Sequence, residues 1–133
     1  MGRQTTPLPG GELEYAVLAN LWRLETATAR DLHRIVGEPQ GLVYTTIAKV
    51  LDRLTAKGLV ARKRTGKAFV YRARVKRSVV ELARARLALK GLLGSTPQAP
   101  MATLVEAVES LDPQLLGDLE RAVAARRRSQ HGA

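Results

Sequence analysis

The amino-acid sequence predicts a mainly α fold with a small β-hairpin, continued by a helical C-terminal region. Two observations carry this prediction. Apolar residues recur at intervals of three and four along most of the 133-residue chain, which is the pattern of amphipathic helices. The pattern stops at residues 59–74, where two short segments flank a glycine-bearing tip and the second is rich in β-formers. The length suits one domain of ordinary size with room for a small appended module.

Two helices are expected near the N-terminus. The first covers residues 12–24, whose leucine, valine and tryptophan side chains share one stripe. The second covers residues 29–36. Thr28, with Asp31 three positions later, fits a capping box, in which each side chain bonds the backbone N–H of the other residue. A loop with two glycines and a proline is expected at residues 37–41.

A third helix is predicted from Val43 to Lys57, and it leads directly into the hairpin. Gly58 suits the left-handed position that follows a helix end. The hairpin strands are expected at residues 59–64 and 68–74. Three helices followed by a two-stranded hairpin form the order of a winged helix-turn-helix domain, in which the hairpin is the wing.

Three more helices are predicted after the hairpin. The first is long and begins after Ser78, residues 94–100 break the pattern, and the second follows at residues 101–110. Asp112-Pro113 is expected to open the last helix, with the aspartate as N-cap and the proline at the first helical position. The predicted divisions are a winged-helix domain at 10–75, a helical region at 76–128, and flexible ends at 1–9 and 129–133.

The charge of the chain indicates a polyanionic partner. Twenty-two lysines and arginines oppose 12 acidic residues, giving a net charge of +10 and a pI near 10.9. The excess is concentrated between residues 49 and 90, where 14 basic residues accompany only two acidic ones. A segregated positive block suits the release of counterions from one face of a nucleic acid duplex.

The third helix and the hairpin hold residue types that a DNA-binding surface needs. In a winged helix the third helix enters the major groove, and the hairpin tip reaches the flanking backbone. Hydroxyls, small side chains and cations suit base edges, thymine methyl groups and phosphates. We therefore expect double-stranded DNA to be contacted by Tyr44, Thr45, Thr46, Ala48, Lys49 and Arg53 of the recognition helix and by Arg62, Lys63 and Lys67 of the wing.

The C-terminal region is predicted to form a homodimer. Its three apolar stripes are too extensive for a lone helical tail in water, and a second copy is the simplest cover, since closed two-fold pairs are the commonest oligomers. Two recognition helices can then bind two half-sites together. The expected interface residues are Leu82, Ala85, Leu89, Leu92, Leu104, Val108, Leu115, Leu119 and Val123.

The sequence resembles the BlaI/MecI penicillinase-repressor family of winged-helix transcriptional regulators. The resemblance covers residues 10–75, and the remainder agrees in length and helical layout. It implies a homodimeric repressor that binds a palindromic operator. The segments that carry it are Gly11-Glu12-Leu13-Glu14, Val17-Leu18, Leu21-Trp22, Tyr44-Thr45-Thr46-Ile47, Val50-Leu51-Asp52-Arg53-Leu54, Lys57-Gly58-Leu59-Val60, Gly66-Lys67, Phe69 and Tyr71-Arg72.

Two departures from that family concern how repression is lifted. Members that respond to β-lactams are cut at an Asn-Phe pair in the C-terminal helices, after a membrane sensor protease is triggered. The comparable stretch here, residues 104–108, reads Leu-Val-Glu-Ala-Val and holds no such pair. Copper-responsive relatives carry C-terminal cysteines, and this chain has none. An upstream sensor protease thus remains a candidate partner without a matching cleavage site.

Enzyme, metal and membrane classes are not expected. The two histidines, His33 and His131, assemble with no nucleophile or metal-spaced set, and the chain has no cysteine. We predict no catalytic residues, no metal and no cofactor. No apolar run approaches the ~20 residues of a membrane span, and the N-terminus lacks a signal-peptide core. The expected location is the cytoplasm.

Two alternatives remain at this point. A winged helix can also serve as a protein- or RNA-binding module without operator specificity. The basic amphipathic segment 79–93 could instead lie on an anionic membrane, although a dimer seam explains its stripe more simply.

Overall fold

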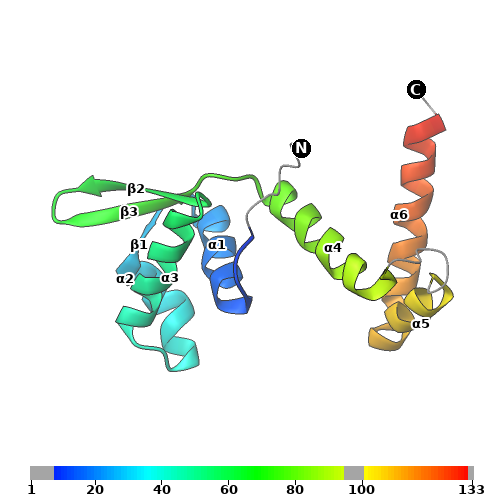
Figure 1. The fold of residues 1–133 in the computed structure, drawn as a ribbon, viewed down its shortest axis with the longest axis horizontal. Coiled ribbons are helices and arrows are strands. Elements are labelled where there is room, and N and C mark those ends of the chain that lie inside the picture. The colour runs from blue at the N-terminus through cyan, green and yellow to red at the C-terminus, as the bar shows by residue number, and fades with distance from the viewer. Residues whose placement is uncertain (1–7, 95–100, 132–133) are drawn as a thin grey trace. The chain divides into compact units, whose positions relative to one another are not determined.

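The computed structural model describes residues 8–94 and 101–131, and it divides the chain into two compact units after Arg86. The predicted fold class is confirmed, since a helical chain carries one small antiparallel sheet (Figure 1). Flexible ends were predicted at 1–9 and 129–133, and a break at 94–100. Of these, residues 1–7, 95–100 and 132–133 lie outside the described residues.

The first unit begins with helix α1 (Glu12–Leu24) and the short helix α2 (Ala29–Leu32). The capping box at the start of α2 is confirmed. The backbone N–H of Asp31 donates to Thr28 Oγ1 at 3.1 Å, and the backbone N–H of Thr28 donates to Asp31 Oδ2 at 3.0 Å. Both bonds satisfy N–H groups that a helix start leaves unpaired, which explains why α2 begins at this point.

The second predicted helix is shorter than expected. The α-helical turns end at Leu32, where a π-helical turn, η1 (His33–Gly37), and a 3-10 turn, η2 (Glu38–Gln40), take over. Gly37 lies so close to the next helix that a Cβ there would sit 3.0 Å from Ile47 Cγ1. The spacing of apolar residues gives no sign of such a close backbone approach. The α-helix predicted for residues 29–36 was therefore wrong from residue 33 onward.

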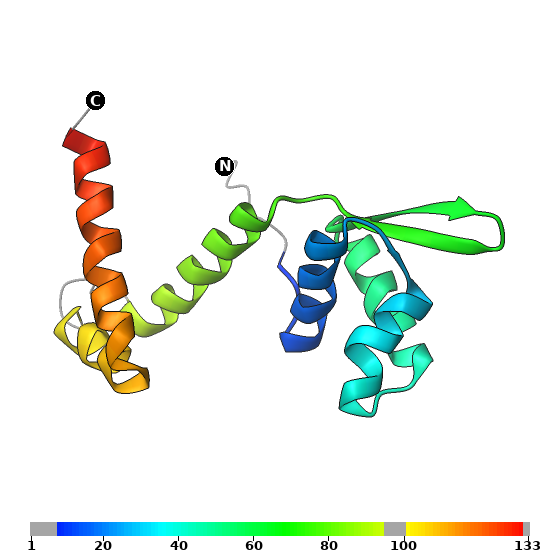
Figure 2. The same cartoon turned by 180° about the vertical axis from the view of Figure 1, so that it is seen from behind.

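Helix α3 (Tyr44–Ala56) agrees with the prediction to within one residue at each end. Gly58 follows it at φ 78°, in the left-handed region predicted for a helix end. Strands β2 (Val60–Thr65) and β3 (Ala68–Ala73) then form the predicted hairpin, turning at Gly66 with φ 65°. Figure 2 shows the hairpin projecting beyond α1, α2 and α3.

A third strand was not expected. Strand β1 (Ala27–Thr28) pairs antiparallel with β3, so the sheet order is β1-β3-β2. Two residues are too short to show an alternation of period two, so no strand was predicted between the first two helices. The pairing ties the root of the wing to the start of α2.

The core of this unit is formed where α1, α2 and α3 pack against one face of the sheet. Helix α4 (Arg77–Leu93), which follows the sheet in the chain, adds Val80 to this core, and Val80 is fully buried. The indole N–H of Trp22 also donates to the backbone carbonyl of Val75 at 2.9 Å. The core side chains are Val17, Leu18, Leu21, Ala27, Ala29, Leu32, Val36, Ile47, Val50, Leu51, Leu54, Leu59, Val60, Tyr71 and Val80.

The second unit holds the last part of α4 with helices α5 (Met101–Leu111) and α6 (Pro113–His131), and α5 packs along α6. The predicted N-cap is confirmed, since the backbone N–H of Gln114 donates to Asp112 Oδ1 at 3.0 Å. Helix α6 continues to His131, beyond residue 128 where a flexible end was expected to start. Neither α5 nor α6, both fully described, has a buried residue.

Candidate nucleic-acid interface

One side of α3 packs in the core, and the opposite side presents the residues predicted to contact DNA. Ile47, Val50, Leu51 and Leu54 are fully buried, which fixes the rotation of the helix. Of the predicted set, Tyr44, Thr45, Lys49 and Arg53 are exposed, and Thr46 and Ala48 are half-buried. The amphipathic pattern therefore placed the polar side of this helix correctly.

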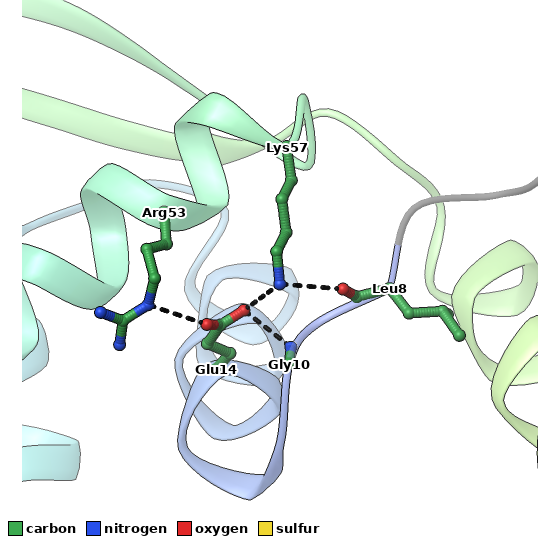
Figure 3. A network of polar contacts seen from close by, with 5 residues as sticks. All are labelled: Leu8, Gly10, Glu14, Arg53 and Lys57. Atoms are coloured by element: carbon green, nitrogen blue, oxygen red, sulfur yellow. Dashed lines mark hydrogen bonds and ion pairs between the residues drawn. The ribbon is translucent and has the colours of Figure 1, made fainter.

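Arg53, which was predicted to contact DNA, also has a partner within the protein that was not predicted from the sequence. Its Nε donates to Glu14 Oε2 of α1 at 3.0 Å, and Lys57 Nζ donates to Glu14 Oε1 at 2.8 Å (Figure 3). Among the described residues, Glu14 is the only charged one that is buried. Burial raises the pKa of its carboxyl, but hydrogen bonds from Lys57, the Gly10 N–H and Arg53 outweigh that effect and lower the pKa below 4.5.

The wing separates its predicted cations onto two faces. Arg62 lies opposite Tyr71, and Lys63 lies opposite Val70, so these neighbours point away from each other. Arg62 stacks over the ring of Phe69 at 4.3 Å and reaches Asp52 of α3 at 3.6 Å. Arg62 is thus partly neutralised within the protein.

Among the five cations predicted to contact DNA, the three lysines have no ion pair within the described residues. Within residues 8–94 and 101–131, no carboxylate lies within ion-pair distance of Lys49, Lys63 or Lys67. All three are exposed. Their charges stay available to a polyanion, whereas those of Arg53 and Arg62 are shared with Glu14 and Asp52.

A shallow hollow brings the start of α3 and the wing tip together. It measures about 410 Å³, and Tyr44 and Lys67, which were predicted separately, both line it. The ring of Tyr44 also meets His33 edge-on at 6.0 Å. The remaining lining residues are Thr28, Ala29, Arg30, Ala68, Phe69 and Tyr71.

Three residues that form or support this surface were not predicted from the sequence. Arg30 lines the hollow from α2, but a single arginine on a short helix gave no signal by itself. Val43 stands at the N-cap of α3 and is 62% exposed, although serine, threonine, aspartate and asparagine are the preferred N-caps. Glu14 carried no signal for its pairing with Arg53 and Lys57, because these partners lie 39 and 43 positions away.

The predicted dimer residues fall into two groups. Leu82, Leu89, Leu92, Leu115 and Val123 are exposed at between 39% and 52% of their surface. Leu104, Val108 and Leu119 are half-buried on α5 and α6, and Ala85 is exposed.

The described residues contain no group of three metal-ligating side chains and no helix long and apolar enough to cross a membrane.

Comparison with known proteins decides the family. The family model described as "Penicillinase repressor" matches residues 10–125. The chain belongs to the penicillinase repressor family. This membership confirms the resemblance drawn from the sequence, and it confirms the prediction that the chain is no enzyme, because the family is one of repressors.

Two curated relatives match part of the chain. Both are the "Transcriptional regulator BlaI" of Mycobacterium tuberculosis, from the strains CDC 1551 / Oshkosh and ATCC 25618 / H37Rv. Each is 42% identical over 62 residues, which is 46% of this chain and 45% of the relative. The match therefore spans less than half the length of these relatives.

Proposed function

We propose that the chain is a homodimeric transcriptional repressor that binds a palindromic operator in duplex DNA. The observation that carries the proposal is the surface shared by α3 and the wing. An exposed polar helix side with Thr45 and Lys49 lies in the same unit as the exposed cations Lys63 and Lys67. This combination fits a helix in the major groove and a hairpin on the flanking backbone.

In this proposal residues 10–75 bind DNA and residues 76–128 dimerise. The absence of buried residues from α5 and α6 supports the second part, because both helices carry apolar side chains that one copy leaves in water. The first turns of α4 also stabilise the proposed DNA-binding part, since Val80 packs in its core.

The proposed repressor acts in the cytoplasm, where its operator lies. The proposal leaves the signal that lifts repression open, because residues 104–108 lack the Asn-Phe pair; proteolysis by an upstream membrane sensor protease is one candidate. A cut within α5 would break the apolar surface that we assign to the dimer.

The proposal is tested by titrating the full-length protein against duplex DNA, double-stranded RNA and single-stranded RNA at several salt concentrations. We expect duplex DNA to bind most tightly, with an affinity that falls steeply as salt rises, because phosphate contacts release counterions. Preference for RNA, or no salt-dependent binding of duplex DNA, would instead favour the protein- or RNA-binding alternative.

A further inference from the structure

Glu14 holds the N-terminal segment and two cations of the recognition-helix end in one network (Figure 3). Its Oε1 accepts from Lys57 Nζ at 2.8 Å and from the Gly10 N–H at 2.7 Å, and its Oε2 accepts from Arg53 Nε at 3.0 Å. The Glu14 side chain is only 7% exposed. A carboxylate so buried requires these partners, since an unpaired buried charge is strongly unfavourable.

The two cations of this network are used differently. Lys57 directs its ammonium inward, to Glu14 and to the backbone carbonyl of Leu8 at 3.2 Å, and its side chain is 34% exposed. Arg53 gives Glu14 only its Nε, and its side chain remains 55% exposed. In Figure 3 the two terminal nitrogens of Arg53 point away from Glu14.

We propose that Glu14 is a positioning residue for DNA binding, which fixes Arg53 through Nε so that its two Nη groups bind one DNA phosphate. The inference rests on the proposed function and adds to it a residue outside the winged-helix contact set. Only a guanidinium can serve both partners, because its planar fork offers donors on two edges, whereas a lysine ammonium is a single point of charge.

The charges of the network agree with this arrangement. One buried carboxylate lies between two cations, so the group keeps one net positive charge. The inward ammonium of Lys57 can balance Glu14, which leaves the outward edge of Arg53 for an anion. A phosphate diester presents oxygens that match two parallel N–H donors.

The test uses full-length variants and a random-sequence DNA duplex about three helical turns long, so that no operator needs to be known. Binding is followed by fluorescence anisotropy between about 50 and 200 mM salt. Arg53→Gln and Lys57→Gln form a matched pair, since each removes one positive charge and one partner of Glu14. We expect Arg53→Gln to lower the salt slope by about one per protomer, and Lys57→Gln to leave the slope unchanged.

Arg53→Lys separates charge from geometry. Its ammonium stays with Glu14, so we expect the same loss of slope as in Arg53→Gln although the charge is retained. Glu14→Gln tests the positioning role in a double-mutant cycle. It should weaken duplex binding when Arg53 is present and have no further effect in the Arg53→Gln background.

Each result has a definite meaning. Equal slopes for Arg53→Gln and the unchanged protein, or an unchanged slope in Arg53→Lys, would overturn the proposal. So would a Glu14→Gln loss that persists without Arg53. If Glu14→Gln does not fold, the Arg53 and Lys57 variants still decide, because both keep a cation or a hydrogen bond at Glu14. Failure of the unchanged protein to bind duplex DNA would reject the proposed function itself.

Discussion

At the scale of single residues, the charge offered by the candidate interface depends on partners inside the protein. Arg53 and Arg62 share their charge with Glu14 and Asp52, while Lys67 at the wing tip lies beyond ion-pair reach of every carboxylate among the described residues. A cation without an internal partner gives up no ion pair when it binds a phosphate. Lys67 should therefore contribute more to DNA binding than Arg62 does.

The replacement Lys67→Glu should weaken duplex binding without changing stability, because the side chain is exposed and makes no contact that folding needs. The binding isotherm and the thermal unfolding midpoint are measured side by side. Lys90→Glu, the same charge change on α4, serves as the control and should weaken binding far less. Equal losses of DNA affinity in the two variants would show that affinity depends on the net charge of the protein and does not depend on a contact made by the wing.

Glu14 also makes stability depend on pH. Its pKa in the folded protein lies below the ordinary 4.5, although burial alone would raise it, because Lys57, Gly10 and Arg53 stabilise the charged form. A lowered pKa means that the stabilisation is complete above about pH 4.5 and is lost as the pH falls through the folded-state value. Asp31, whose pKa is lowered by hydrogen bonds from Thr28, adds a similar effect.

Glu14→Gln should therefore reduce the free energy of unfolding at neutral pH and flatten its fall at acid pH. Urea unfolding at pH 7, 5, 4 and 3 measures both effects. Glu120→Gln replaces an exposed glutamate of α6 and should leave the pH profile as it was. An acid-induced loss in Glu14→Gln as large as in the unchanged protein would contradict this role of the network.

At the scale of elements, the first turns of α4 belong to the first unit, which holds the candidate nucleic-acid interface. Val80 is fully buried, Tyr15 Oη donates to Glu81 Oε2 at 3.1 Å, and Arg84 lies 3.6 Å from the centre of the Tyr15 ring. A fragment that ends at Val75 loses all three contacts, whereas one that ends at Arg86 keeps them. The division of the chain after Arg86 agrees with these contacts.

Two neighbouring valines of α4 allow a matched test of this packing. Val80→Ala should lower the free energy of unfolding by about 2 kcal/mol, from lost apolar burial and the cavity left behind. Val79→Ala removes the same atoms from a residue that is 44% exposed and should change stability by less than about 0.5 kcal/mol. Denaturant unfolding measures both, and equal losses would contradict the assignment of Val80 to the core.

Most elements could be predicted from the sequence because each has a local signal. The apolar period marked α1 and α3, Thr28 and Asp31 marked the start of α2, and Gly58 marked the end of α3. The exposed side of α3 followed from the same period. Local patterns thus identified most of the candidate surface.

The remaining features depend on contacts between distant segments. Strand β1 exists because Ala27 pairs with Tyr71, and the π-helical turn lies where Gly37 meets Ile47. Glu14 meets Arg53 across 39 positions, so no local pattern linked them. One sequence without an alignment of homologues carries no signal for such pairs.

At the scale of the whole molecule, the proposed repressor is a pair of two copies of the chain. Helices α5 and α6 bury no residue, and Leu89 and Leu92 of α4 are 39% and 47% exposed. An apolar surface of this extent is rarely left in water. Pairing of two copies would cover it and bring two recognition helices to one operator.

Leu89→Glu should convert the dimer into a monomer, because it places a charge in the proposed apolar seam. Sedimentation at micromolar concentration gives the mass, and an operator titration gives the affinity, which should fall strongly with the loss of avidity. Lys90→Glu, on the next residue and already polar, should remain dimeric. If the Leu89→Glu protein sediments with the same mass as the unchanged protein, Leu89 does not belong to the interface.

Operator binding by a homodimer is tested most directly by selecting bound duplexes from a random DNA pool and footprinting the enriched sequence. We expect a two-fold symmetric site, with half-sites centred about one helical turn or a small multiple apart, and protection that extends to the flanking backbone beside each half-site. Failure to enrich any sequence over random DNA, or an enriched site without two-fold symmetry, would contradict a homodimeric operator-binding repressor.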